Sequence, residues 1–265
     1  VGLTATCAFT VRVNDTELPN IICSNNIIKS SDANACGAVV AYTNPTYSDN
    51  CSGAGLDHLS GGTSGSTFPV GTTNVVWKAT DAANNTRTCL FSITVNDAQA
   101  PTITCPANMT RPTTTGQCAA QVTFTNPAAS DNCAAPTLQW VSGGTSTVQG
   151  PSTSTGTFGK GTTTVQWKAT DGAGLTKTCT FRVIVNDTEA PTMSCPAGLN
   201  VNASPGQCGA AVTYSTPTYT DNCAPTSGTA VRVSGPASGS FFAVGTTNVV
   251  FRATDAASNT RQCTL

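Results

Sequence analysis

Short runs of alternating apolar and polar residues recur along the chain, separated by turn-forming residues. Every second residue from Cys118 to Phe124 faces the same way and is apolar or small, and the same holds from Cys179 to Val185. A period of two is typical of β-strands that bury one face, and no stretch has a helical period of useful length. The abundance of Thr, Val, Gly and Pro also disfavours helices. The pattern therefore predicts an all-β protein.

The runs belong to a unit that recurs three times. One stretch reads VNDTELPNIIC at Val13–Cys23, VNDAQAPTITCP at Val95–Pro106 and VNDTEAPTMSCP at Val185–Pro196. Each copy ends one alternating run, passes an Asp and a Pro, and begins the next run. Self-similarity of this kind indicates a tandem array, so we interpret the stretch as the joint between two modules.

Each predicted module has about seven strands in ~85 residues, which fits an immunoglobulin-like β-sandwich. One strand follows a GTT turn in every module and carries Trp77, Trp167 or Phe251, aromatic residues that we expect in the core. The prediction is thus a set of tandem immunoglobulin-like β-sandwich modules, end to end. Their expected bounds are residues 1–15 for the C-terminal strand of a preceding module, then 16–97, 98–187 and 188–265, the last with a truncated final strand.

The cysteines repeat with the modules. The chain has 13 cysteines, which form three sets of four in equivalent positions and leave Cys7 where the fourth cysteine of a preceding module would lie. Many cysteines in small modules indicate disulfides formed in an oxidising, extracytoplasmic compartment. No C-x₂-C pair is present, which argues against a zinc site.

Four cysteines allow three connectivities, and topology favours one of them. The second and fourth cysteines lie on inward faces of their strands, and the first and third are expected at the same end of the sandwich. With the partner of Cys7 outside this sequence, we predict the disulfides Cys23–Cys51, Cys36–Cys89, Cys105–Cys133, Cys118–Cys179, Cys195–Cys223 and Cys208–Cys263.

The order of these motifs resembles the hyalin repeat (HYR) domain over essentially the whole chain. The run GQCGAAVTY at Gly206–Tyr214 and the DNC motif at Asp221–Cys223 carry the resemblance, with Ser24 and Phe251 as minor departures from a Pro and a Trp. The resemblance implies an immunoglobulin-like fold in tandem arrays of secreted, extracellular or cell-surface proteins, generally linked to adhesion. It implies no enzymatic activity.

Charge excludes two classes of partner. Charged residues are 9% of the chain and the net charge is −1, so there is no basic field for nucleic acid and no polybasic patch for a membrane. No apolar run approaches the ~20 residues of a spanning helix, so membrane insertion is not expected.

The acidic residues gather in turns. Three carboxylates per module are expected to converge at each joint, and Ca²⁺ binds oxygen ligands of this kind. The alternative is that each Asp only closes its own turn by accepting backbone N–H groups, and both interpretations stay open. The candidate metal ligands are Asp15, Asp97 and Asp187 in the joints, Asp49, Asp131 and Asp221 in the DNC motifs, and Asp81, Asp171 and Asp255 in the ATD turns.

Other chemistry is sparse. His58 is the only histidine, and its repeat equivalents are Trp140 and Ala230, so no catalytic set recurs. Sequons begin at Asn14, Asn84, Asn108, Asn186 and Asn202, where glycosylation depends on the host.

Two hypotheses of function follow. The first is a structural, adhesive segment of a long extracellular stalk or filament, whose partners are further copies of the same repeat and whose joints are stiffened by Ca²⁺. The second is a module that binds a cell-surface glycan or protein, for which Trp140 and the longer loop Ser142–Thr157 are the only hint. Within the first, residues Ala8–Val13 could complete the last strand of another module, in a continuous chain or by strand donation between subunits.

Overall fold

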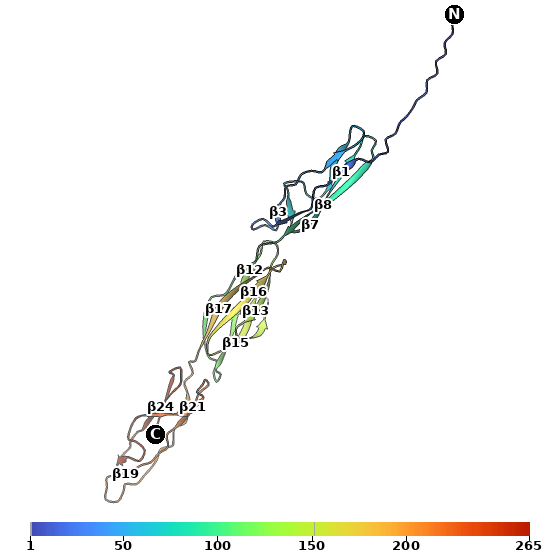
Figure 1. Cartoon of the computed structure of the whole chain (residues 1–265). Coiled ribbons are helices and arrows are strands. Elements are labelled where there is room, and N and C mark those ends of the chain that lie inside the picture. The colour runs from blue at the N-terminus through green and yellow to red at the C-terminus, as the bar shows by residue number, and fades with distance from the viewer. Residues whose placement is uncertain (1, 151) are drawn as a thin grey trace. The chain divides into compact units, whose positions relative to one another are not determined.

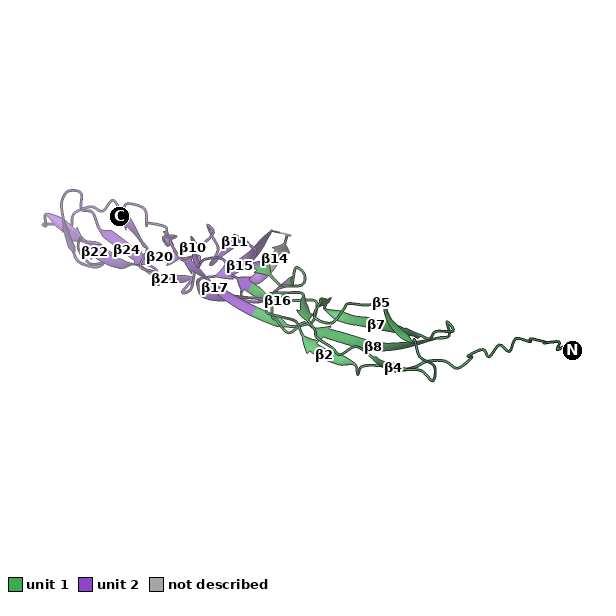
Figure 2. Cartoon of the chain, turned by 90° about the horizontal axis from the view of Figure 1, so that it is seen from above, with its two compact units in different colours: residues 1–102, 129–137, 169–177 green, residues 103–128, 138–168, 178–265 purple. Residues whose placement is uncertain are grey.

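The structure of the protein is a computed structural model that describes residues 2–150 and 152–265, without the side chains of residues 146–149. Every regular element among the described residues is a strand (Figure 1). The strands divide into two compact units (Figure 2). Unit 1 holds residues 1–102, 129–137 and 169–177, and unit 2 holds residues 103–128, 138–168 and 178–265.

The first module lies wholly within unit 1. Its four-stranded sheet has the order β2-β8-β7-β5, in which β2 pairs in parallel with β8 and the other neighbours are antiparallel. Two smaller pairs, β1-β4 and β3-β6, complete the sandwich. The strands are β1 (Asn20–Ile22), β2 (Ile27–Ser30), β3 (Gly37–Val39), β4 (Thr46–Ser48), β5 (Gly55–Ser60), β6 (Thr67–Pro69), β7 (Gly71–Thr80) and β8 (Thr86–Asn96).

Alternation explains the two long strands of this module. β7 and β8 have 10 and 11 residues, and their inward positions are almost completely buried. On β8 the buried side chains are Phe91, Ile93 and Val95, which pack with Trp77 of β7 in one core cluster. Burying a side chain of this size contributes ~1.5–3 kcal/mol relative to leaving it in water.

The second module repeats this plan. In unit 2, β10 pairs in parallel with β17, with Met109 opposite Val183 and Arg111 opposite Val185, and β15 pairs with both β11 and β14. The strands are β9 (Thr102–Thr104), β10 (Met109–Pro112), β11 (Ala119–Thr125), β12 (Ala128–Ser130), β13 (Thr137–Ser142), β14 (Thr145–Gln149), β15 (Thr153–Gly159), β16 (Gly161–Thr170) and β17 (Thr176–Asn186).

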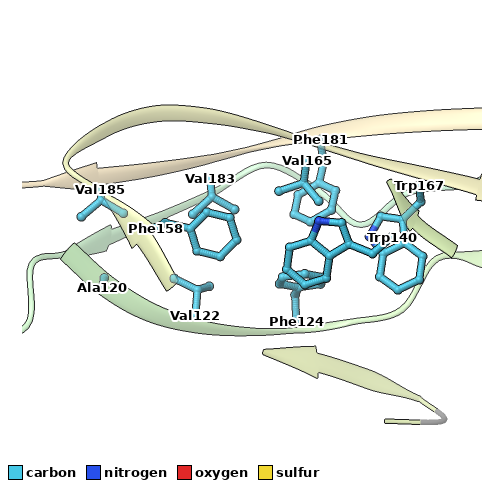
Figure 3. Close-up of a cluster of buried hydrophobic side chains, with 10 residues drawn as sticks. All are labelled: Ala120, Val122, Phe124, Trp140, Phe158, Val165, Trp167, Phe181, Val183 and Val185. Atoms are coloured by element: carbon cyan, nitrogen blue, oxygen red, sulfur yellow. The ribbon is translucent and has the colours of Figure 1, made fainter. Parts of the chain in front are cut away.

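Figure 3 shows how the core of this module is filled from two sides. Ala120, Val122 and Phe124 point inward from β11, as their alternation predicts, and meet the inward row of β17. The ring of Phe124 lies 5.0 Å from that of Phe181 and 5.2 Å from that of Trp140. The Phe124–Phe181 pair is edge-to-face, and such a pair adds ~0.5–1.5 kcal/mol beyond the area it buries.

The third module, within unit 2, has shorter strands. Its last two, β24 and β25, have five residues each, half the length of β7 and β8. The strands are β18 (Thr192–Met193), β19 (Gly209–Ala211), β20 (Thr218–Thr220), β21 (Ser227–Thr229), β22 (Val231–Ser234), β23 (Phe241–Ala243), β24 (Val250–Thr254) and β25 (Thr260–Thr264).

The predicted fold class is confirmed, and the three expected core aromatics are 8%, 2% and 1% exposed at Trp77, Trp167 and Phe251. The compact units do not follow the predicted module bounds, which stay a prediction.

Candidate functional site

Three disulfides close the three modules, and each joins the first cysteine of a set to the fourth. They are Cys23–Cys89, Cys105–Cys179 and Cys195–Cys263, all with Cα atoms 5.7 Å apart. Cys89 continues the inward row of β8, two residues before Phe91, and Cys23 just after β1 packs against the same core. The first and last strands therefore meet where these two cysteines lie.

Two further disulfides join successive modules. Cys36 bonds Cys133 within unit 1, with Cα atoms 4.6 Å apart, and Cys118 bonds Cys223 within unit 2, at 4.8 Å. In both, the second cysteine of one module bonds the third cysteine of the next. The predicted pairings are therefore wrong, namely Cys23–Cys51, Cys36–Cys89, Cys105–Cys133, Cys118–Cys179, Cys195–Cys223 and Cys208–Cys263.

The observed pairing follows from the end of the sandwich at which each cysteine lies. The backbone N–H of Ser31 donates to the carbonyl of Asn96, so the turn that leads to Cys36 lies where the chain leaves the module. Cys51 lies beside Asp15, where the chain enters. The second and third cysteines of one module are thus at opposite ends, and each can reach only a neighbouring module. Cys7, Cys51 and Cys208 are free and exposed.

Hydrogen bonds support the inter-module disulfide in unit 1. The side-chain amide of Asn132 donates to the carbonyl of Ala35 at 2.9 Å and to Asp97 Oδ1 at 3.3 Å. The backbone N–H of Asn34 donates to Gln99 Oε1 at 2.8 Å. The turn before the second cysteine is therefore bonded both to the DNC motif of the next module and to the joint segment.

Unit 2 repeats the arrangement at equivalent positions. The amide of Asn222 donates to the carbonyl of Gln117 at 3.0 Å, and the N–H of Gly116 donates to Glu189 Oε2 at 2.7 Å. Sequence reasoning missed these asparagines, although the repetition of Asn within each DNC motif was the signal that could have identified them.

The DNC aspartates each use one oxygen locally. Asp49, Asp131 and Asp221 accept the N–H of the following cysteine through Oδ2 at 2.9–3.0 Å. The other oxygen, Oδ1, is buried in all three and has no hydrogen-bond partner among the described residues. Each therefore closes its turn, as one interpretation expected, and keeps a carboxylate oxygen for another ligand.

The ATD aspartates are buried, and in two of them both carboxylate oxygens accept hydrogen bonds. Asp81 and Asp255 accept two backbone N–H groups through Oδ1, and their Oδ2 atoms accept the amides of Asn85 and Asn259 at 2.8 Å. These amides also donate to the carbonyls of Asp15 and Asp187 at 3.3 and 3.2 Å.

Asp171 differs from the other two because Leu175 occupies the position of the asparagine. Its Oδ1 accepts the N–H groups of Ala173 and Leu175, at 2.9 and 2.8 Å. Its Oδ2 is buried without a partner among the described residues.

The expected three-aspartate cluster forms at one joint. Asp187, Asp221 and Asp255 each offer an oxygen within 4.8 Å of the others, but Lys160 Nζ lies 3.2 Å from Asp187 Oδ2, a basic neighbour that the sequence did not predict. At the other joints the matching clusters are Asp15, Asp49 and Cys51, and Asp97, Asp131 and Cys133. Asp81 and Asp171 are not members of those clusters.

The surroundings of the first joint shift two pKa values. Burial by itself would raise the pKa of Asp81, but hydrogen bonds from the Asn85 side chain and from backbone N–H groups outweigh it and lower the pKa. The pKa of the Cys51 thiol is raised, first by a hydrogen bond to Asp15, then by burial and by the negative charges of Asp15, Asp49 and Asp81.

The remaining candidates are placed as follows. Trp140 is 9% exposed in the core, and its Nε1 donates to the carbonyls of Ser142 and Gly143, so it is no exposed binding residue. Of the loop Ser142–Thr157, residue 151 and the side chains of 146–149 lie outside the described residues. The described part of the chain has no helix long and apolar enough to cross a membrane. Asn14, Asn84, Asn108, Asn186 and Asn202 are all exposed, and their glycosylation stays a prediction.

Comparison with known families matches the chain to the HYR domain three times, at residues 14–95, 96–185 and 186–265. Among curated proteins, hyalin of Strongylocentrotus purpuratus is 34% identical over 257 residues, 94% of this chain and 20% of that protein. Hyalin of Lytechinus variegatus is 35% identical over 133 residues, 48% of this chain and 24% of that protein. The chain thus spans about a fifth to a quarter of the length of these relatives.

A third relative is the sushi, von Willebrand factor type A, EGF and pentraxin domain-containing protein 1 of Rattus norvegicus. It is 27% identical over 66% of this chain and 5% of its own length. Among solved structures, protocadherin gammaB7 EC3-6 is similar at 15% identity with a TM-score of 0.37, covering 95% of this chain and 77% of that one.

Proposed function

The chain belongs to the HYR domain family, and on that premise we propose that it is a structural, adhesion-type segment of an extracellular array in which disulfides transmit tension from module to module. The observation that carries the proposal is the set of five disulfides: three close the modules, and two, Cys36–Cys133 and Cys118–Cys223, join successive modules. A segment of this kind acts through its mechanics and through contacts with further modules of the same repeat.

The five disulfides overlap along the chain. The loop that each inter-module disulfide closes contains one cysteine of the preceding module-closing disulfide and one cysteine of the following module-closing disulfide. All three modules are therefore linked by disulfides. A covalent path through the three module-closing disulfides leaves only the segments from Cys89 to Cys105 and from Cys179 to Cys195 as free backbone. Each has about 16 residues and spans at most ~55 Å when extended.

Stretching single molecules tests this proposal. Pulled from its ends, the oxidised chain should show no extension step beyond ~55 Å between Cys23 and Cys263, because the disulfides bypass the module bodies. The same molecules in reductant should lengthen by roughly 250–300 Å for each module that unfolds. Steps of the longer kind in the oxidised chain would refute the proposal.

Ca²⁺ is the finer part of the proposal. Buried carboxylate oxygens without a partner, Asp49 Oδ1 and Asp15 Oδ2 at the first joint and Asp131 Oδ1 at the second, are hard ligands that fit this ion. Asp97 would join them at the second joint. Bound there, Ca²⁺ would offset the repulsion between carboxylates and stiffen the joint. At the third joint the ammonium of Lys160 already supplies one positive charge to Asp187, so we expect weaker binding by Asp187, Asp221 and Asp255.

A further inference from the structure

The two inter-module disulfides differ in their exposure to solvent. Cys36 is exposed, whereas the other nine cysteines that the structure pairs are partly or fully buried. In the disulfide of unit 2, Cys118 is partly buried and Cys223 is only 1% exposed. A small solute can therefore reach the disulfide of unit 1 from the side of Cys36, whereas burial restricts access to the disulfide of unit 2.

Charge adds to burial at the other end of the unit 1 disulfide. Cys133 is partly buried, and an oxygen of Asp97 and one of Asp131 lie within 4.8 Å of its Sγ atom. A thiolate that attacked Cys133 would approach these two carboxylates, and like charges repel. Thiol–disulfide exchange depends on which sulfur the thiolate can reach. The sulfur open to attack is therefore that of Cys36.

The turn that carries Cys36 is held by bonds that do not depend on the disulfide. Cys36 lies between β2 and β3, where the N–H of Asp32 donates to the carbonyl of Gly37 at 2.7 Å and the N–H of Val70 donates to the carbonyl of Cys36 at 3.4 Å. Lys29 and Asp32 pair with each other at 3.1 Å, so the charges beside this turn balance. Breaking the S–S bond would therefore leave the turn in place.

The modules on both sides would also stay closed. Each keeps its own module-closing disulfide and its core. At the joint, the amide of Asn132 would still donate to the carbonyl of Ala35, and the N–H of Asn34 to Gln99 Oε1. Such hydrogen bonds contribute little net free energy each, because water competes for the same groups. Without the covalent bond the joint would therefore open and reclose while the modules remain folded.

We propose that Cys36 is a thiol-exchange site, at which a small thiol reduces the Cys36–Cys133 disulfide and releases the joint of unit 1 without unfolding the modules. The inference rests on the proposed array function and gives that function a chemical control. Under the same conditions the joint of unit 2 stays cross-linked, because Cys223 is buried. One joint is thus reducible and the next is permanent.

The reaction consumes two molecules of a monothiol such as reduced glutathione. The first thiolate attacks Cys36 Sγ, the S–S bond breaks, and Cys133 leaves as a thiolate that takes up a proton. The second thiolate attacks the glutathione sulfur of the mixed disulfide, and Cys36 leaves and is protonated in turn. Two cysteine thiols are formed, and two small thiols are oxidised to one small disulfide.

Graded reduction of the purified 265-residue chain with glutathione tests the site. The free cysteines Cys7, Cys51 and Cys208 are first blocked with N-ethylmaleimide. Thiols released later are alkylated with iodoacetamide and located by mass spectrometry. We expect Cys36–Cys133 to be reduced at least ~10-fold faster than Cys118–Cys223, because the rate follows access to the attacked sulfur. The trapped mixed disulfide should carry glutathione on Cys36.

Hydrogen exchange reports whether the joint is released. In Cys36→Ser with Cys133→Ser, the N–H of Asn34 should exchange faster than in the native chain, and the amides of β7, β8, β16 and β17 should not change. The matched control is Cys118→Ser with Cys223→Ser, in which Asn34 should exchange as in the native chain and Cys36–Cys133 should still be reduced rapidly.

Three outcomes would overturn the inference. The first is reduction of Cys118–Cys223 or of a module-closing disulfide as fast as Cys36–Cys133. The second is a mixed disulfide found on Cys133, and the third is unchanged exchange at Asn34 once the bond is removed. A digest taken before glutathione is added keeps the two proposals apart. If it contains both inter-module disulfides and Cys36–Cys133 then resists glutathione, the proposed array function stands and only the exchange site fails. If it lacks them, the array function itself fails.

Discussion

Cys118 and Cys223 are separated by 105 residues, yet their Cα atoms lie 4.8 Å apart in a disulfide that joins a turn of the second module to the DNC motif of the third. The amide of Asn222, the neighbour of Cys223, donates to the carbonyl of Gln117, the neighbour of Cys118. The covalent bond and the hydrogen bond therefore fix the same two turns to each other, which makes this joint a defined structural element of unit 2.

Removing this disulfide should loosen the joint in unit 2. In the chain-entropy model a loop of this length stabilises by up to ~4.7 kcal/mol. The Cys118→Ser, Cys223→Ser double variant should lose less than that, because Cys105–Cys179 and Cys195–Cys263 still constrain the unfolded chain. Hydrogen exchange should accelerate around Gly116, and the urea midpoint of unit 2 should fall.

Cys7→Ser is the matched control for this measurement, because Cys7 is exposed and free. Unchanged exchange around Gly116 in the double variant would mean that hydrogen bonds alone hold the two turns together.

Calcium should raise the thermal midpoint of the chain, and chelator should reverse the effect. A ligand that binds only the folded state stabilises by ~2.7 kcal/mol at a hundredfold excess over its Kd. Calorimetry should lose a binding event in Asp131→Asn, which replaces the carboxylate whose Oδ1 has no partner among the described residues.

The control for the calcium titration is Asp57→Asn, on a side chain that is 61% exposed, pairs with Lys78 and belongs to none of the acidic clusters at the joints. No heat and no change of midpoint with Ca²⁺ in the native chain would exclude the cation.

The asparagine that donates a hydrogen bond to an ATD aspartate should stabilise any module that carries it. Asn259→Leu removes the donor to Asp255 Oδ2 and should destabilise the third module by ~1–3 kcal/mol, the cost of leaving a buried acceptor unpaired. The reciprocal Leu175→Asn gives Asp171 Oδ2 a donor and should stabilise by ~1 kcal/mol. In denaturant titrations each variant serves as the control for the other. Unfolding midpoints that shift in the same direction in both variants would contradict this prediction.

The first module should lose a stabilising contribution in acid that depends on Asp32. Its carboxylate accepts the N–H of Val39 at 2.8 Å and pairs with Lys29 at 3.1 Å, and these contacts hold the pKa of Asp32 below its ordinary value. A group whose pKa is lower in the folded state stabilises fully above its unfolded pKa, about 4. The contribution then fades as pH falls through the folded value.

The difference in unfolding midpoint between native chain and Asp32→Asn should therefore be larger at pH 7 than at pH 2. Thr114 occupies the equivalent place in the second module, so unit 2 provides an internal reference in the same titration. A difference that does not change with pH would show that the charge of Asp32 has no part in stability.

Local rules made much of this fold predictable from sequence. The alternation on either side of Val122 and Val183 required strands with one buried face, and the aromatic positions of Trp77 and Trp167 were identified as core because each recurs at the same point of a strand. The turns were equally predictable, because a turn Asp accepts the backbone N–H of the residue two positions further along and needs no distant partner. Such features depend on neighbours within a few residues.

The tertiary structure decided which cysteines pair and which side chains meet at each joint. Nothing near Cys36 shows that its turn lies at the exit end of the module while Cys51 lies at the entry, and this separation makes Cys133 its partner. Likewise, Lys160 reaches Asp187 only because the end of β15 and the end of β17 fold to the same end of the sandwich. By itself the sequence determined the strands, the turns and the repeat, because they follow from local alternation. Which ends of the strands meet depends on packing between residues far apart in the sequence. Only the folded chain decides this.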